Sequence, residues 1–192
     1  MKKRTLLATA ALLPLLSGCA ALKVADYAAE KPVLDLREYF NGPLSAHGMF
    51  QDRSGKVIKR FTVAMQGTWK GDVGTLEEDF SYSDGTTQRR VWTLTRGPDG
   101  QYTGRADDVV GEATGQARGN AFHWQYTLQQ PVDGKVYDVQ MDDWMFLIDD
   151  KRMLNRTEMR KFGIRLGDAT VSFTNPRTGH PPHPPPSPCH PP

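Results

Sequence analysis

The sequence predicts an all-β protein: an antiparallel up-and-down barrel of about 8–10 strands with a short N-terminal helix. Turn sequences recur at short intervals in the central part of the chain, and apolar side chains alternate with polar ones between them. No internal stretch shows a convincing helical stripe ten residues long. An up-and-down sheet exposes two edges unless it closes, so a closed barrel is the economical arrangement.

Five turn sequences divide the central chain into strands. Glycine and asparagine tolerate the positive φ of a tight reversal, and proline fixes the φ of an early turn residue. These turns are Ser54-Gly55, Asp84-Gly85, Pro98-Asp99-Gly100, Gly119-Asn120 and Asp133-Gly134. Their spacing leaves room for nine or ten strands.

The segments between the turns have the two-residue period of strands. In residues 121–128 the large apolar side chains share one face and polar ones share the other. Residues 90–95 place Trp92 and Leu94 together, and residues 57–69 are long enough to bend, with Gly67 as a break. The one segment suited to a helix is 25–40, which would cover the core or cap an opening.

The N-terminus has the order of a secretory signal, with three cations followed by an apolar run too short to span a membrane. The four residues that close the run, Leu16, Ser17, Gly18 and Cys19, resemble the lipobox of Gram-negative lipoproteins. That resemblance implies cleavage before Cys19 and its modification by acyl chains such as palmitate. An ordinary signal peptide with an incidental cysteine is the alternative. Ala20 after the cysteine favours the outer membrane, with the protein facing the periplasm.

We therefore expect four parts: a signal peptide (1–18), a lipidated tether and docking segment (19–42), the barrel (43–174) and a disordered Pro/His-rich tail (175–192). The docking segment should bury a group of apolar residues, Val33, Leu34, Leu36, Tyr39 and Phe40. The tail carries potential ligands for a soft metal, His180, His183, Cys189 and His190, but a floppy tail makes a weak site, and adventitious composition is the preferred interpretation.

The charge of the mature chain is close to zero. Cleavage before Cys19 removes three of the 24 basic residues and leaves the 22 acidic ones in place. A near-neutral chain without basic clusters lacks the electrostatic footprint of a nucleic-acid-binding protein. Apart from the lipid-bearing cysteine the only thiol is Cys189, so no intramolecular disulfide is expected.

Several short runs, in the same order, resemble an uncharacterised family of Gram-negative lipoproteins with a calycin-like, lipocalin-type barrel. The resemblance covers residues 34–174, and its family has no established activity. Members are often encoded beside enzymes of membrane fatty-acid modification, which implies a lipid-related role, and they usually lack a Pro/His-rich tail. The runs are 76–80 (LEEDF), 84–85 (DG), 90–92 (RVW), 102–104 (YTG), 119–121 (GNA), 143–145 (DWM) and 161–163 (KFG).

One strand places a carboxyl group on the predicted inner face. Asp143 is in phase with Val139 and Met141, among which a carboxylate is costly unless it is paired. Arg156 or Arg90 could pair it. Such a pair is either a charge-satisfied plug inside the barrel, the preferred interpretation, or a site that recognises the polar head group of a lipid.

Trp69, Trp92, Trp124 and Trp144 either line an apolar cavity or pack in a filled core, and core packing is the preferred interpretation. Asp107 or Asp108 must also face inward if that segment is a strand, and would then need a buried partner. The candidate ligand-binding residues are Trp92, Trp124, Tyr126, Asp143, Trp144 and Arg156.

Catalytic candidates are few. Asp142 and Asp143 point to opposite faces of a strand and make a poor dyad. The barrel segment holds only His47 and His123, no cysteine, no Gly-x-Ser-x-Gly and no metal-ligand spacing. His123 lies on the polar phase of its strand and should face solvent. We therefore predict no catalytic residue, no metal site and no cofactor, and a protein that is not an enzyme.

Three functions differ in what they require of the structure. A non-enzymatic barrel that binds a lipid or fatty acid needs an internal cavity of a few hundred Å³ lined by the tryptophans. A structural or interaction lipoprotein of the envelope needs a solid barrel and an exposed apolar patch. A lipid-modifying enzyme, ranked third, needs a cleft in which Asp143 or His123 has a shifted pKa.

Overall fold

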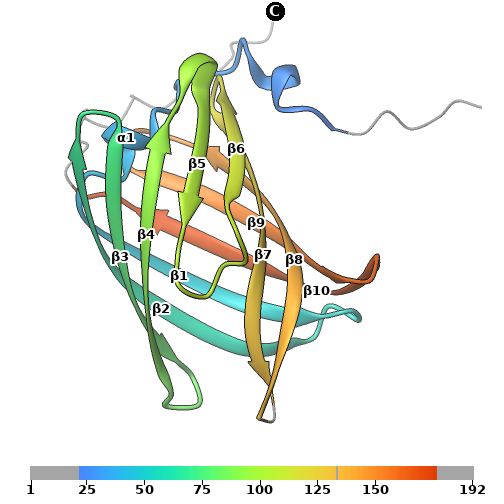
Figure 1. Cartoon of the computed structure of the whole chain (residues 1–192). Coiled ribbons are helices and arrows are strands. Elements are labelled where there is room, and N and C mark those ends of the chain that lie inside the picture. Colours follow the sequence, from blue (N-terminus) through green and yellow to red (C-terminus); the bar gives the residue numbers. More distant parts are fainter. Residues whose placement is uncertain (1–21, 133, 177–192) are drawn as a thin grey trace, which may run out of the picture.

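The computed structural model describes residues 22–132 and 134–176. Within them ten strands form a closed barrel in which every neighbouring pair is antiparallel and the strands follow one another in sequence order (Figure 1). This confirms the predicted fold class. The strands are β1 (Gly42–Asp52), β2 (Val57–Lys70), β3 (Val73–Tyr82), β4 (Thr87–Arg96), β5 (Gln101–Arg105), β6 (Ala113–Arg118), β7 (Ala121–Val132), β8 (Lys135–Leu147), β9 (Arg152–Lys161) and β10 (Ile164–Thr174).

The predicted signal peptide, Cys19 and the metal-binding candidates of the tail lie outside the described residues. Among the residues that are described, no helix has the length and apolar character needed to cross a bilayer.

The two ends of the barrel differ. Because the strands alternate in direction, the β1–β2, β3–β4, β7–β8 and β9–β10 hairpins and the β5–β6 loop all lie at one end, which we call the mouth. The other end carries the remaining turns, among them the 3-10 turn η2 (Pro98–Gly100) between β4 and β5, and the helix α1 (Leu36–Tyr39) (Figure 1).

The helix expected over residues 25–40 is present as two shorter pieces. The 3-10 helix η1 (Val24–Tyr27) and α1 are separated by a turn and a bend, and the bend contains Pro32. Proline has no N–H to continue a helix and disfavours the helical conformation of the residue before it. Asp35 then caps α1, its carboxylate accepting a hydrogen bond from the Arg37 N–H at 2.8 Å.

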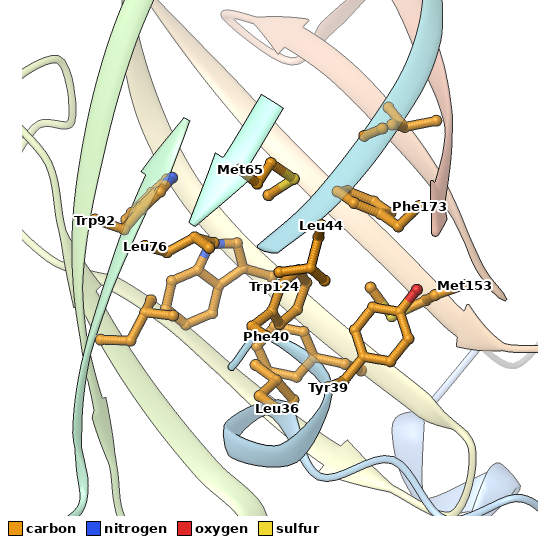
Figure 2. Close-up of a cluster of buried hydrophobic side chains, with 14 of the residues drawn as sticks. Leu36, Tyr39, Phe40, Leu44, Met65, Leu76, Trp92, Trp124, Met153 and Phe173 are labelled. Atoms are coloured by element: carbon orange, nitrogen blue, oxygen red, sulfur yellow. The ribbon is translucent and has the colours of Figure 1, made fainter. Parts of the chain in front are cut away.

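The segment before β1 closes one end of the barrel. Leu36, Tyr39 and Phe40 are buried, and the Tyr39 hydroxyl donates to the Lys151 carbonyl at 3.0 Å. Figure 2 shows them packed against residues of seven strands, Leu44, Met65, Leu76, Trp92, Trp124, Met153 and Phe173. We call this closure the plug; it forms one end of the apolar core.

Four of the five apolar residues expected to be buried in this segment are buried, and Val33 is not. Val33 is 58% exposed, whereas the next residue, Leu34, is 4% exposed. The Leu34 N–H donates to the Gly119 carbonyl at 2.8 Å, so this stretch is extended and held against the β6–β7 turn. Successive side chains of an extended chain point to opposite sides, which sends Val33 into solvent.

The sequence predicted a break in β2 at Gly67, but the structure shows no break there. The strand is paired continuously through Gly67, with Gly42 on one side and Leu76 on the other. A Cβ atom at position 67 would lie 1.6 Å from the Phe40 carbonyl oxygen. The glycine therefore gives the end of the plug room to lie directly on the barrel wall.

Replacing Gly67 by alanine should displace the plug and lower the free energy of unfolding by about 1–3 kcal/mol or more, as overpacking does elsewhere. Denaturant unfolding followed by circular dichroism measures it. Gly97→Ala is the matched control, because a Cβ there meets its nearest neighbour at an ordinary 3.6 Å. Equal effects of the two substitutions would contradict this account of the plug.

Candidate ligand cavity

The barrel is hollow. A cavity of about 620 Å³ extends from the plug residues Leu36 and Phe40 toward the mouth, where Ile58, Tyr137 and Leu166 line it. This volume lies within the range of sites that bind small molecules. The cavity has the volume that the lipid-binding hypothesis requires, and two of the four tryptophans, Trp92 and Trp124, line it. The chain does not form the solid barrel that the structural hypothesis requires.

Strand alternation makes the cavity wall largely apolar. Every second residue of each long strand points inward, and most of these residues are aliphatic, aromatic or methionine. Methionine side chains are flexible and polarizable, which suits a wall that must adapt to a chain-like ligand. Apolar lining residues include Phe61, Val63, Met65, Phe80, Leu94, Leu128, Val139, Met141, Met145, Met159 and Val171.

Two tryptophans and a tyrosine form one part of the wall. The Trp92 ring is edge-on to Tyr126, with centroids 5.4 Å apart, and to Trp124, at 5.8 Å. Small residues make space for them: a Cβ at Gly104 would lie 2.8 Å from the Trp124 ring, and one at Gly115 would lie 2.7 Å from it. The wall therefore depends on glycines of β5 and β6, which the sequence alone did not identify.

A buried guanidinium anchors a polar cluster inside the barrel. Arg90 on β4 donates from Nε and Nη2 to Asp108 of the β5–β6 loop at 2.8–3.0 Å. Its Nη1 lies 3.8 Å from the carboxylate of Glu78, its register partner on β3. Gln88 also donates to Asp108 at 3.1 Å. Asp108 is therefore the inward member of the Asp107–Asp108 pair considered above.

Asp143 on β8 belongs to the same cavity and is only 5% exposed. One of its oxygens, Oδ1, has no hydrogen-bond partner among the described residues. Tyr126 and Thr157 are the polar neighbours that lower the pKa of the carboxyl group, and the Thr157 hydroxyl donates its hydrogen to Asn155 Oδ1 at 3.1 Å. Asp143 thus lies beside polar side chains, but they leave its Oδ1 without a hydrogen bond.

Burial changes the acidity of both inner carboxyl groups that face the cavity. Loss of water raises the pKa of Asp143 to about 7, against the lowering effect of hydrogen bonds with Thr157 and Tyr126. Burial likewise raises the pKa of Glu78 to about 7, although Arg90 lowers it. With Asp108, the cluster holds three carboxyl groups against the single guanidinium of Arg90.

Four of the six candidate ligand-binding residues line the cavity, namely Trp92, Trp124, Tyr126 and Asp143. The placement of the other two in a pocket was wrong: Trp144 and Arg156 lie on the outer face, opposite one another on β8 and β9. Trp144 follows Asp143 directly, so an inward Asp143 requires an outward Trp144. The Trp144 ring stacks on His123 with centroids 4.2 Å apart.

The predicted partners of Asp143 are also corrected. No salt bridge in residues 22–132 and 134–176 joins Asp143 to Arg90 or to Arg156. Arg156 cannot reach it because it points outward, and Arg90 is engaged by Asp108 and Glu78. Glu78 itself was missed in the sequence, although its two-residue phase with the apolar Leu76 was a usable signal.

His123, considered above as a general base, does not line the cavity. His123 contacts the outer Asp142, with Nε2 2.8 Å from Oδ1, in keeping with its place on the polar phase of β7. Within the described part of the chain, no group of three or more His, Cys, Asp or Glu side chains is arranged to hold a metal ion.

The mouth carries a concentration of exposed apolar side chains. Eight of the fifteen large apolar side chains that are exposed in the described residues lie on three adjacent hairpins, and Phe162 at one tip is 87% exposed. We call this group the rim. It comprises Val57 and Ile58 of β1–β2, Val132, Val136 and Tyr137 of β7–β8, and Phe162, Ile164 and Leu166 of β9–β10.

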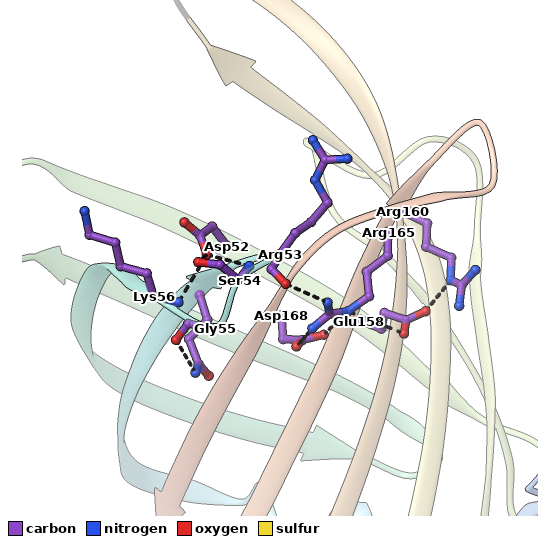
Figure 3. Close-up of polar contacts among 10 residues, drawn as sticks. Asp52, Arg53, Ser54, Gly55, Lys56, Glu158, Arg160, Arg165 and Asp168 are labelled. Atoms are coloured by element: carbon purple, nitrogen blue, oxygen red, sulfur yellow. Dashed lines mark hydrogen bonds and ion pairs between the residues drawn. The ribbon is translucent and has the colours of Figure 1, made fainter.

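Polar contacts hold two of these hairpins together beneath their tips (Figure 3). The Arg165 guanidinium on β10 donates to the Arg53 carbonyl on the β1–β2 turn at 3.4 Å and pairs with Asp168. In the β1–β2 turn, the Asp52 carboxylate accepts from the N–H groups of Ser54 and Lys56 at 2.8 and 3.1 Å. The rim is therefore presented on ordered turns.

Basic side chains accompany the rim. Arg53, Lys56 and Lys135 lie on the β1–β2 and β7–β8 hairpins, and none takes part in a salt bridge within the part of the chain that the structure describes. The Lys161 ammonium lies 4.7 Å from the centre of the Phe162 ring and 5.1 Å from that of Tyr137. Acidic residues of the β5–β6 loop lie on another part of the mouth.

A model of the family described as "Protein of unknown function (DUF3833)" matches residues 13–175 of the chain. No curated protein matches it. Among solved structures, a de novo designed fluorescence-activating β-barrel is similar over 73% of this chain and 97% of its own length, with 15% sequence identity and a TM-score of 0.38. At that identity and score, the likeness carries no argument about function.

The raised pKa values predict how stability depends on pH. The folded state keeps Asp143 and Glu78 protonated up to about pH 7, whereas the unfolded chain releases these protons near the ordinary values of 3.8 and 4.5. Between those limits the unfolded state holds fewer protons, so the free energy of unfolding falls as pH rises, by up to about 1.4 kcal/mol per pH unit for each group.

Asp143→Asn removes one of the two contributions. The variant should gain stability relative to the unsubstituted chain as pH rises from 4 to 8, by about 2–4 kcal/mol over that interval. Urea unfolding at a series of pH values measures this. Asp138→Asn, at an exposed position of the same strand, is the control. A difference between the two variants that does not change with pH would refute the assignment.

Proposed function

The chain belongs to the DUF3833 family of proteins of unknown function, and we propose that it is a non-enzymatic barrel that binds a molecule with a long apolar chain, a lipid or a lipid-derived compound of the cell envelope. The observation that carries the proposal is the apolar cavity of about 620 Å³. The plug closes one end of this cavity, and its lining residues continue to the mouth at the other end. An elongated apolar space with one polar wall suits an amphiphile.

The two alternatives fare differently. A solid structural barrel is disfavoured by the cavity itself, whereas the rim is the exposed apolar patch that this alternative also requires. A lipid-modifying enzyme has one observation in its favour, the carboxyl groups of Asp143 and Glu78 with pKa values raised to about 7, because a buried carboxyl group of that kind can act as a general acid or base. It lacks an evident nucleophile among the side chains that line the described cavity. Binding without chemistry is therefore our first choice.

The proposal includes the cellular location inferred from the sequence. Lipidation of Cys19 would anchor the barrel to the periplasmic face of the outer membrane. Tyr27, whose ring packs against Trp144 and Phe146 of the barrel, follows Cys19 by eight residues, and an extended chain spans at most ~3.5 Å per residue, so the barrel would work within a few tens of Å of the bilayer. A barrel so tethered exchanges ligand with that membrane and does not carry it over long distances.

The rim supports exchange with a bilayer. Its exposed apolar side chains surround part of the cavity mouth and are accompanied by Arg53, Lys56 and Lys135, the pattern that favours a surface with an apolar interior and anionic head groups. Contact of the rim with the bilayer would let an apolar chain pass into the cavity without crossing water. Ligand exchange with a bilayer therefore explains why the rim is apolar, whereas a mouth that faces only solvent would not require apolar side chains.

Native mass spectrometry of the detergent-extracted protein should reveal a bound ligand of lipid mass, identified by analysis of the released compounds. Val139→Trp, which fills the cavity from β8, should reduce the bound fraction about tenfold, since the site depends on free volume. The control is Gln140→Trp, the neighbouring position on the outer face. Equal occupancy in both variants, or no ligand in the unsubstituted protein, would count against the proposal.

The same incubations distinguish the enzyme alternative. Products of ester cleavage or isomerisation that accumulate with the unsubstituted chain, and not with Asp143→Asn, would favour catalysis over binding. We expect the recovered compounds to be unchanged.

An environment-sensitive fluorophore at position 162 tests the rim. In a chain with Cys19→Ser and Cys189→Ser, the label on Phe162→Cys should shift to the blue with vesicles of phosphatidylethanolamine and phosphatidylglycerol, and less with phosphatidylcholine alone, because the rim is apolar and its flanks are basic. A label on Ile148→Cys, exposed at the plug end, is the control. Identical emission shifts at both positions would show that the mouth is not the surface that contacts the membrane.

A further inference from the structure

The charges inside the barrel restrict the polar end of the ligand. Two cationic side chains line the described cavity: Lys161, which lies at the mouth, and Arg90, which is already held by Asp108 through three contacts of 2.8–3.0 Å. Glu78 adds a second carboxyl group 3.8 Å away. A ligand carboxylate or phosphate would have to displace Asp108, which comes from a loop of the same chain. Arg90 is therefore not a free anion site.

Asp143 offers the complementary feature. Its side chain is 5% exposed, lines the cavity, and leaves Oδ1 without a protein hydrogen-bond partner among the described residues. Buried oxygens of this kind are nearly always satisfied. At pH 8, above the pKa of about 7, both oxygens of the Asp143 carboxylate accept hydrogen bonds, so the missing partner of Oδ1 is a donor.

The neighbours of Asp143 define the rest of this polar wall. Thr157 is its register partner on β9, and the Tyr126 hydroxyl reaches it from β7. Asn155 lies two residues before Thr157 on the same inward face and lines the cavity as well. These groups offer a ligand further hydrogen bonds, and none of them carries a positive charge.

We propose that the cavity is selective for amphiphiles whose polar end is a hydrogen-bond donor without negative charge, an amine, amide or hydroxyl group on a long apolar chain, and that Asp143 receives this donor. The inference rests on the proposed binding function and narrows its ligand class. It also disfavours one of the ligands expected from the sequence, a free fatty acid in its ionised form, because a carboxylate placed beside Asp143 would lie among the carboxyl groups of Asp143 and Glu78, with the Arg90 guanidinium already occupied.

Three twelve-carbon compounds test this: dodecylamine, dodecanol and dodecanoate. Each compound is tested for displacement of the uncharged fluorescent probe N-phenyl-1-naphthylamine from the full-length protein at pH 8. Each compound is kept below its own critical micelle concentration. We expect the amine to bind about tenfold or more tightly than dodecanoate, with dodecanol between them. Asp143→Asn should abolish most of the difference. Asp142→Asn, the adjacent carboxylate on the outer face, should leave it unchanged.

The outcomes separate the two proposals. If the probe and all three compounds fail to bind, the binding function itself is wrong and the ligand class falls with it. If dodecanoate binds as tightly as the amine or more tightly, the binding function stands and the selectivity is wrong. If the amine is preferred equally by Asp143→Asn, then Asp143 is not the acceptor. Should that variant fail to fold, Asp143→Ser gives the same comparison.

Discussion

Strand alternation within a closed sheet is the constraint on which the rest of this structure depends. Once the barrel closes, every second side chain of each strand is committed to the interior, and a neighbour cannot be moved there without moving the whole strand. This single rule sends Asp143 inward and Trp144 outward, and it places Glu78 and Arg90 on adjacent strands at the same level of the wall. The interior polar cluster is therefore a consequence of register, and its members come from segments far apart in the sequence.

The asymmetry of the two ends gives the barrel its direction. At one end the plug uses Gly67 and the buried rings of Tyr39 and Phe40 to seal the wall, so the interior loses contact with water there. At the other end no comparable segment covers the described hairpins, and the apolar rim continues the apolar character of the wall outward. A chain-like ligand would therefore enter and leave by the mouth, with its leading end near the plug.

Local patterns predicted the barrel well, because turns and alternation are properties of neighbouring residues. The same alternation should have excluded Trp144 once Asp143 was placed inward, and it should have included Glu78, which is in phase with Leu76. The contact between Arg90 and Asp108 lay beyond this reasoning, since it needs the β5–β6 loop to fold back over the wall. Nor could the cavity be foreseen, because it depends on the difference between the radius of a ten-stranded barrel and the summed volume of its inward side chains.

The buried carboxyl groups are best understood together with the cavity. An unpaired carboxyl group taken out of water costs roughly several kcal/mol, and an apolar side chain at position 143 would avoid that cost and could fill space as well. A barrel selected only for stability would have made both changes. This one keeps a hollow interior and, facing it, a carboxyl oxygen that the described residues leave without a partner. The two features stabilise nothing in the free protein, and each acquires a purpose when a ligand fills the volume and donates to Asp143.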